Sequence, residues 1–265
     1  MGNLVRYQAV DGVATLTMCD PPGNNYTHEM LKEMDEGILK ARFDDTVHVI
    51  VLTGDGEKFF SSGANIKMLA SVTPQFKYYF CLHANETLSR FEQTPKLVIA
   101  ALNGHTVGGG LEIAMAADIR IARKSNDFKI GLPEVALGVL PGTGGTQRLT
   151  RLIGTSKAIE MMVDGSNFSF ETAEKMGIIN RQIEATDTAD FMTKIYDYAK
   201  SFVPPGKAAF AVGRIKRSCQ TGGQIPLEYG LALERELQAE LFNSADAKEG
   251  LKAYTEKRKA NFQAK

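Results

Sequence analysis

The sequence predicts an α/β fold, in which short buried strands alternate with amphipathic helices. Two continuous apolar runs, at residues 47–53 and 97–102, have the length and composition of buried strands. Between them, residues 75–93 carry apolar side chains at helical spacing, and the pattern stops before Pro95. Strands that alternate with helices along one chain are typical of the α/β class.

The first predicted elements are a β-hairpin and a helix. Residues 4–18 alternate in part between apolar and polar side chains around an Asp11-Gly12 turn, which is the pattern of a hairpin. A Pro- and Gly-containing break at 21–25 follows, and Thr27 is then the expected N-cap of a helix. The apolar residues of this helix recur about one turn apart: Met30, Leu31, Met34, Ile38 and Leu39.

The middle of the chain is expected to alternate between the two kinds of element. In order, the predicted elements are a strand at 47–53, a loop at 61–66, a helix at 75–93, a strand at 97–102, a helix at about 111–117 and a strand at 119–122. A Gly-Asp-Gly turn closes the first of these strands, and three consecutive glycines precede the short helix.

The carboxy-terminal part of the sequence has a different character. A Pro-Pro-Gly break at 204–206 introduces segments that are almost wholly helical, and helices are expected at 227–243 and 246–261. The sequence therefore predicts a core at residues 1–195 and a helical region at 196–265.

Composition and charge indicate a globular enzyme without a nucleic-acid or membrane partner. The 265 residues include 31 Lys and Arg and 31 Asp and Glu, whereas nucleic-acid binders usually carry a basic excess. No apolar stretch approaches the ~18 residues of a membrane span, and the amino terminus lacks a signal peptide. Cys19, Cys81 and Cys219 are widely spaced and are expected to be reduced thiols. We therefore expect a cytoplasmic protein.

Residues 103–112 combine a strand end, three glycines and a helix start, which is typical of an anion site. Glycine lets the backbone approach a ligand, and the first N–H groups of a helix have no internal partner. The glycines fit neither a dinucleotide fingerprint nor a phosphate loop, and simple packing is the alternative. A second candidate N–H lies at Ala64, after the small residues 61–63. Two such groups aimed at one carbonyl oxygen would form an oxyanion hole.

Glu112 and Glu134 are the candidate catalytic pair. Glu112 is surrounded in sequence by apolar residues, and a carboxylate in a buried helix indicates a functional site. A surface residue that complements the helix dipole is the alternative. Two carboxyl groups at one substrate can hold different protonation states, so one donates a proton while the other activates water. The four histidines have no metal-ligand spacing, so no metal site is expected, and His105 is expected to have a packing role.

Three ordered motifs, at residues 60–66, 103–112 and 133–149, resemble the enoyl-CoA hydratase (crotonase) family. The resemblance covers nearly the whole chain, including 257–262. It implies a crotonase-like spiral of ββα units, followed by a helical carboxy-terminal region that mediates trimer formation, with trimers often pairing into hexamers. It also implies that the partner is an acyl-CoA thioester. Coenzyme A is then part of the substrate, and no separate cofactor is expected.

The resemblance assigns the substrate-binding residues. Backbone N–H groups of Ala64 and Gly109 would hold the thioester oxygen, and Asn65, Ile66 and Lys67 would adjoin the substrate. Members of the family commonly carry aspartate after the oxyanion-hole alanine, whereas this chain has Asn65. The backbone donor should survive this change, but contacts to the CoA arm are expected to differ.

Two lysines near the end of the chain are candidates for contacts with the CoA phosphates. Lys257 and Lys259 correspond to basic residues near the terminus of the family. The alternative is that they lie on the solvated face of a charged helix.

Glutamates at both positions of the family's acid pair imply syn hydration of a trans-2-enoyl-CoA to a 3-hydroxyacyl-CoA. Glu112 would activate water for attack at Cβ, and Glu134 would deliver a proton to Cα. The nearest alternative is a Δ3,Δ2-enoyl-CoA isomerase, which needs one glutamate that Glu134 would supply. Another acyl-CoA-processing relative of the crotonase family is a further alternative, because the oxyanion hole is shared by members with different reactions. An alternative of another class is a non-catalytic RNA-binding relative, which the balanced charge disfavours.

Overall fold

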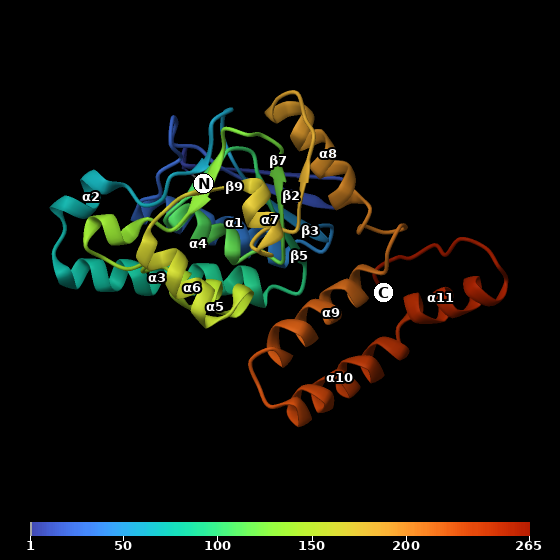
Figure 1. The fold of residues 1–265 in the computed structure, drawn as a ribbon. Helices are drawn as coiled ribbons and strands as arrows, with labels where there is room; N and C mark the ends of the chain where they lie inside the picture. The colour runs from blue at the N-terminus through green and yellow to red at the C-terminus, as the bar shows by residue number, and fades with distance from the viewer. Residues whose placement is uncertain (1) are drawn as a thin grey trace.

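The computed structural model describes residues 2–265 and contains a large and a small β-sheet. The large sheet has six strands in the order β1-β2-β3-β5-β7-β10 (Figure 1). The β1–β2 pair is antiparallel, and every other pair in this sheet is parallel. Its strands are β1 (Val5–Val10), β2 (Val13–Met18), β3 (Val49–Gly54), β5 (Leu97–Leu102), β7 (Ile119–Arg123) and β10 (Arg181–Ile183).

The hairpin predicted at the amino terminus is confirmed. Val10 of β1 pairs with Val13 of β2, which leaves Asp11 and Gly12 as a two-residue turn. Both turn residues have positive φ angles, 47° and 83°, and this is the backbone that a tight hairpin turn requires.

The small sheet explains how the chain spirals. It has four strands in the order β4-β6-β8-β9, with bounds Phe59–Ser61, His105–Val107, Lys129–Gly131 and Phe168–Ser169. Each of the strands β3, β5 and β7 in the large sheet is followed by one strand in the small sheet, and helices then lead to the next pair. This repeated β-β-α path confirms the predicted α/β fold class.

The parallel strands of the large sheet are buried on both faces. Every residue of β3 and β5 is buried, as the continuous apolar runs predicted. On one face, Val49, Val51 and Ile99 pack with Phe191 and Ile195 of helix α8 (Thr188–Lys200). On the other face, apolar residues of the same strands pack with helices α1 (His28–Phe43) and α3 (Pro74–Gln93).

The helices begin at residues that the sequence marks as caps. Thr27 Oγ1 accepts a hydrogen bond from Met30 N at 3.3 Å and caps α1, as predicted, and Thr73 caps α3 in the same way. The predicted helix at 111–117 begins earlier, at Gly109, and ends at Met115. The remaining short helices of the core are α2 (Ile66–Ser71), α4 (Gly109–Met115), η1 (Glu134–Leu137), α5 (Gly145–Ile153), α6 (Thr155–Asp164) and α7 (Phe170–Lys175).

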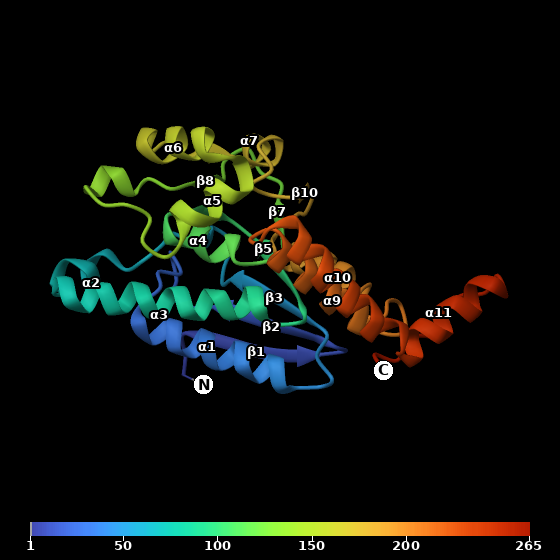
Figure 2. The same cartoon turned by 90° about the horizontal axis from the view of Figure 1, so that it is seen from below.

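Three helices form an arm that extends away from the core: α9 (Ala209–Gly222), α10 (Leu227–Phe242) and α11 (Ala245–Thr255). Figures 1 and 2 both show α9 and α10 side by side and α11 at the far end of this C-terminal arm. A buried lysine fixes α9 to the core, because Lys216 Nζ lies 2.8 Å from Asp118 Oδ2 and donates to the carbonyl oxygen of Phe91 at 2.6 Å. No helix in residues 2–265 is long and apolar enough to cross a bilayer.

Two predicted boundaries in this region differ from the structure. Helix α8 spans Thr188–Lys200, so a division between 1–195 and 196–265 falls inside a helix, and the division itself stays a prediction. The helix predicted at 246–261 is wrong at its end, because α11 ends at Thr255. Side chains replace the helical hydrogen bonds there: Glu249 accepts from the backbone N–H of Asn261 and from the side chain of Arg258, which opposes helix continuation.

Candidate active site

The small sheet brings three chain segments to one place. Strands β4, β6 and β8 run parallel, so their carboxyl ends meet at the same edge. Ala64 follows the end of β4, Gly109 follows β6, and Glu134 follows β8, each within three residues of the strand. Together with Glu112 of α4 they line one cavity of about 100 Å³. The sequence-predicted oxyanion hole and both glutamates therefore share a single pocket.

Two backbone N–H groups in this pocket are available to a ligand. Within residues 2–265, neither Ala64 N–H nor Gly109 N–H has a protein acceptor. Their loops abut, since a methyl group built on Gly63 would lie 3.1 Å from Gly109 N. Tyr26 fixes the first loop, because its N–H donates to Gly63 O and its carbonyl accepts from Asn65 N–H, both at 3.0 Å. The two donors are thus held close together by the backbone.

Glu112 is buried, and both of its carboxylate oxygens accept hydrogen bonds. Its side chain comes from the first turn of α4, and the residue is 2% exposed. Oε1 accepts from the backbone N–H groups of Thr143 at 2.8 Å and Gly145 at 2.6 Å, and Oε2 accepts from the Thr143 hydroxyl. Burial raises the pKa of Glu112, whereas these three donors favour the ionised form and oppose the rise.

Glu134 differs from Glu112 in its hydrogen bonds. It begins the 3-10 helix η1, and its Oε2 atom is buried without a hydrogen-bond partner among residues 2–265. Burial and the nearby charge of Glu112 raise the pKa of Glu134 to about 7. Gly108, with φ +58°, lets this carboxyl approach, because a methyl group at Gly108 would lie 3.1 Å from Glu134 Oε1. Glu134 is therefore able to exist as a neutral acid near pH 7.

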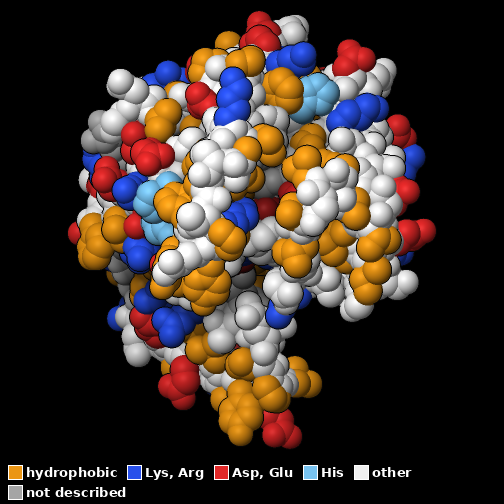
Figure 3. Space-filling model, turned by 90° about the vertical axis from the view of Figure 1, so that its left-hand side faces the viewer, with side chains coloured by type: hydrophobic (Ala, Val, Ile, Leu, Met, Phe, Trp, Pro, Cys, Tyr) orange, Lys and Arg blue, Asp and Glu red, His pale blue; other side chains and the backbone are white. Residues whose placement is uncertain are grey.

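The wall of the pocket is mostly apolar and carries one lysine. Figure 3 looks onto the side of α2 and α3, where hydrophobic side chains surround a hollow with acidic atoms inside it. Lys77 of α3 also lines the pocket, and no ion-pair partner of its Nζ atom occurs in residues 2–265. Its charge lowers the pKa of both glutamates. The apolar lining residues include Ile66, Leu69, Val107, Leu137, Val139 and Leu140.

The sequence of residues 8–265 matches the model of the enoyl-CoA hydratase/isomerase family. The chain belongs to this family. A probable enoyl-CoA hydratase of Bacillus subtilis is 37% identical over 251 residues, which cover 94% of this chain and 95% of the relative. A short-chain-enoyl-CoA hydratase of Clostridium acetobutylicum is 37% identical over 248 residues, which cover 93% and 92%. The predicted family membership is confirmed.

Solved structures of the enoyl-CoA hydratase/isomerase family have the same fold. An enoyl-CoA hydratase from Geobacillus kaustophilus superimposes with a TM-score of 0.95 at 42% identity, covering 100% of this chain and 98% of that structure. One from Bacillus anthracis gives a TM-score of 0.91 at 30% identity, covering 99% and 100%. The crotonase-like fold predicted from the motifs is confirmed over the whole chain.

The three residues after Ala64 do not all reach the pocket. Ile66 lines it. Asn65 instead caps α2, because its Oδ1 atom accepts from Met68 N at 3.0 Å, and Lys67 is exposed outside the lining. Asparagine is as good an N-cap as aspartate, which gives a local structural reason for the departure from the common family residue. Roles of Asn65 and Lys67 in substrate binding stay predictions.

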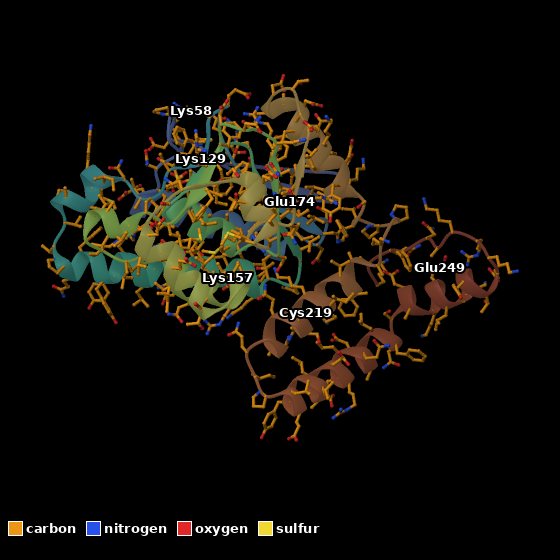
Figure 4. All side chains as sticks on the ribbon, in the orientation of Figure 1. Lys58, Lys129, Lys157, Glu174, Cys219 and Glu249 are labelled. Carbon is orange, nitrogen blue, oxygen red and sulfur yellow. The ribbon has the colours of Figure 1, made fainter. Side chains whose placement is uncertain are left out.

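Lys257 and Lys259 are not near the pocket of their own chain. Both are exposed and follow α11, and the intervening Arg258 forms an ion pair with Glu249 at 2.6 Å. Figure 4 places Glu249 on α11 and Cys219 on α9, in the C-terminal arm away from the core. Neither lysine lines the pocket, and their predicted contact with CoA phosphates stays a prediction.

Three residues of the site were not predicted from the sequence: Tyr26, Lys77 and Thr143. Tyr26 and Thr143 are 117 positions apart, and their hydroxyl groups meet at 3.2 Å. No local pattern marks either residue, because each acts through a contact that exists only in the folded chain. His105, by contrast, has the expected packing role, lying 5.0 Å from the Phe59 ring and 5.4 Å from the Phe128 ring between centroids.

Proposed function

We propose that the protein is a hydro-lyase that adds water across the 2,3 double bond of a trans-2-enoyl-CoA and forms a 3-hydroxyacyl-CoA. The observation that carries this proposal is the contrast between two glutamates in one pocket: Glu112 accepts three hydrogen bonds, whereas Glu134 has a buried oxygen without a partner. Relatives that cover more than nine tenths of the chain are named as hydratases of this substrate class.

The thioester oxygen would bind between Ala64 N–H and Gly109 N–H. These donors stabilise the negative charge that develops on this oxygen when the double bond is attacked at Cβ. The backbone supplies them, so no metal ion or separate cofactor is needed to polarise the thioester.

Glu112 is suited to be the base. A carboxylate has about four acceptor positions, and the two N–H donors fill those of Oε1 while Thr143 fills one on Oε2. The remaining position on Oε2 would accept a hydrogen bond from water and then take its proton as the water oxygen bonds to Cβ. The surrounding donors favour the ionised form that this step requires, against the effect of burial.

Glu134 is suited to be the acid. Its pKa of about 7 leaves a large protonated fraction at neutral pH. It would give this proton to Cα, and the electron pair of the former double bond would form the new C–H bond. After product release, Glu112 loses its proton and Glu134 regains one from solvent.

The test is hydration of crotonyl-CoA, followed by loss of the absorbance of the conjugated thioester. We expect activity in the unaltered protein and a loss of about 10²–10⁴-fold in Glu112→Gln and in Glu134→Gln. Full activity in either variant would exclude the paired mechanism. Isomerisation of a 3-enoyl-CoA by the Glu112→Gln variant, without hydration by the unaltered protein, would favour the isomerase.

We propose that the C-terminal arm assembles the protein into a homotrimer, or a hexamer of two trimers. Helix α10 has sixteen residues but only Leu237 is buried, while Leu227, Leu231 and Phe242 lie on one face and are 75%, 43% and 62% exposed. Apolar side chains concentrated on one helix face indicate a protein contact. Lys257 and Lys259 would then reach the CoA phosphates of a neighbouring copy.

Sedimentation equilibrium tests the assembly. We expect a mass three or six times that of the 28.9 kDa chain, and dissociation in a Leu227→Asp variant. The control is Phe43→Asp, which places the same charge at an 81% exposed residue of α1. A monomer in the unaltered protein would exclude the trimer.

A cytoplasmic location is part of the same proposal. Cys19, Cys81 and Cys219 are free thiols in the structure, which suits a reducing compartment. Fractionation of cells that produce the protein, with antibody detection, tests this location.

A further inference from the structure

A chain of two hydroxyl groups leads from Tyr26 to Glu112. Tyr26 Oη lies 3.2 Å from Thr143 Oγ1, and the Thr143 hydroxyl contacts Glu112 Oε2. Tyr26 is 2% exposed and Thr143 is 2% exposed, so all three groups are shielded from solvent. The Tyr26 ring is held by stacking on Phe80, with centroids 5.8 Å apart and an interplanar angle of 6°.

The protons available to the two hydroxyl groups determine which group donates in each hydrogen bond. An ionised carboxylate only accepts, so the single proton of the Thr143 hydroxyl must point to Glu112 Oε2. The Tyr26–Thr143 contact then needs a proton from Tyr26, which therefore donates to Thr143. Each hydroxyl polarises the next, and the negative end of the chain is the proposed base.

Tyr26 also contacts the two backbone segments that carry the proposed oxyanion donors. A methyl group built on Gly109 would collide with Tyr26 Oη, so the phenol lies directly against the backbone that offers the second oxyanion donor. The backbone of Tyr26 holds the loop of the first donor through Gly63 O and Asn65 N–H. Tyr26 thus contacts both segments whose N–H groups would bind the carbonyl oxygen. Through Thr143 it is also linked to Glu112, the proposed base.

We propose that Tyr26 is a positioning residue of the hydration reaction, which acts through the Thr143 hydroxyl to keep Glu112 ionised and its free Oε2 position directed at the bound water. This inference rests on the proposed function for its catalytic meaning. The link between the hydroxyl chain and the ionisation of Glu112 stands without it.

Other groups also act on Glu112, and the hydroxyl chain must be separated from them. Glu134 faces the same pocket from η1, Lys77 faces it from α3, and Cys81 of α3 lies near the Tyr26 hydroxyl. Burial and the charge of Glu112 both raise the pKa of Tyr26, so the phenol stays protonated and remains a donor across the working pH range. None of these neighbours is altered when a single hydroxyl is removed.

The decisive measurement is an infrared pH titration of the Glu112 carboxyl, with its band assigned by its loss in Glu112→Gln. Variants are Tyr26→Phe, Thr143→Val, Thr143→Ser and the Tyr26→Phe/Thr143→Val pair. A hydrogen bond to a charged group is worth enough that Thr143→Val should raise the Glu112 pKa by about one pH unit. Tyr26→Phe should raise it by a smaller amount, Thr143→Ser should leave it in place, and the pair should match Thr143→Val alone.

Turnover of crotonyl-CoA is measured on the same proteins. The acidic limb of the kcat/KM profile should move upward with the Glu112 pKa, because a larger share of the base is then protonated at a given pH. The control Tyr78→Phe removes a phenol hydroxyl from an exposed residue of α3 outside the pocket and should change neither readout. Thermal unfolding of each variant checks that the fold is kept.

Two results would overturn the inference. One is an unchanged Glu112 pKa in a folded Tyr26→Phe variant, and the other is a Tyr26→Phe shift of the same size in the Thr143→Val background. If Tyr26→Phe does not fold, the Thr143→Val and Thr143→Ser comparison decides whether the hydroxyl chain acts on Glu112. Absence of turnover in the unaltered protein would instead reject the proposed reaction, while the infrared titration would still report on the hydroxyl chain.

Discussion

Glu134 shares its pocket with Glu112, and the charge of Glu112 helps to raise the pKa of Glu134 to about 7. Burial also raises the pKa of Glu112, but two backbone N–H groups and one hydroxyl group stabilise its ionised form and oppose this rise. Burial thus raises the pKa of both groups, and Glu112 has more hydrogen-bond donors that oppose the rise than Glu134 has. The same arrangement makes hydration depend on pH in a defined direction.

We expect the alkaline limb of the kcat/KM profile for crotonyl-CoA to fall at about pH 7. Glu134 has a raised pKa and must be protonated to act as the acid, so its active form is complete below this pKa and is lost as pH rises through it. The residual activity of Glu134→Gln should not show this fall at about pH 7. A profile that stays flat up to pH 9 in the unaltered protein would contradict the assignment of Glu134 as acid.

Lys77→Met should move the whole pH profile to higher values. The positive charge of Lys77 lowers the pKa of both glutamates, so its removal raises both, and the acidic and alkaline limbs shift together by a fraction of a pH unit. Lys77→Arg keeps the charge and is the matched control. Movement of one limb alone would show that Lys77 acts on a single glutamate.

Gly145→Ala should reduce hydration by displacing the Glu112 carboxylate. An added methyl group would lie 2.9 Å from Glu112 Oε1 and 2.7 Å from the Pro141 side chain, so the carboxylate that accepts from Gly145 N–H must shift. Alanine is otherwise favourable in a helix, and Gly145 begins α5. We expect kcat to fall about tenfold or more, as a small misplacement of a catalytic group can cause.

Gly222→Ala is the control for this substitution. Gly222 lies at the end of α9, and an added methyl group would have no neighbour within 4 Å. It should leave kcat unchanged. Equal kcat in Gly145→Ala and the unaltered protein would show that the position of Glu112 tolerates this contact.

Asp118→Asn should weaken the attachment of the C-terminal arm to the core. The Lys216 side chain is 3% exposed and pairs with Asp118 at 2.8 Å, and removal of one partner of a buried pair typically costs 3–5 kcal/mol. Asp55→Asn breaks the pair of Arg6 and Asp55, whose side chains are 61% and 40% exposed, and should cost about 0–1 kcal/mol. Urea unfolding followed by circular dichroism compares the two, and similar costs would contradict the prediction.

The elements that the sequence predicted well are those whose pattern is long enough to repeat. The run at 97–102 is β5 with the same bounds, and the helix predicted at 75–93 is α3, Pro74–Gln93. The three-residue strands β4, β6 and β8 were not predicted, because three residues are too few to show alternation. They form only when their neighbours are in place, yet their ends position the site.

The site was predictable where its residues carry a local motif. Glycines before Glu112 and the Pro-Glu pair at Glu134 marked two of the loops, and the structure brings both glutamates into one pocket. Thr143 and Tyr26 could not be found in this way, because a threonine within a glycine-rich run and a tyrosine before a helix are common. Their role depends on a long-range contact between hydroxyl groups.

The small sheet has a consequence for how this chemistry can change over evolution. In the proposed mechanism, the two carbonyl-binding donors follow β4 and β6, the base Glu112 shares the segment after β6, and the acid Glu134 alone follows β8. A substitution or insertion after β8 would therefore change the proposed proton donor without altering the two backbone N–H groups proposed to bind the thioester oxygen. In this arrangement, a change in one loop alters the reaction while the class of substrate stays the same.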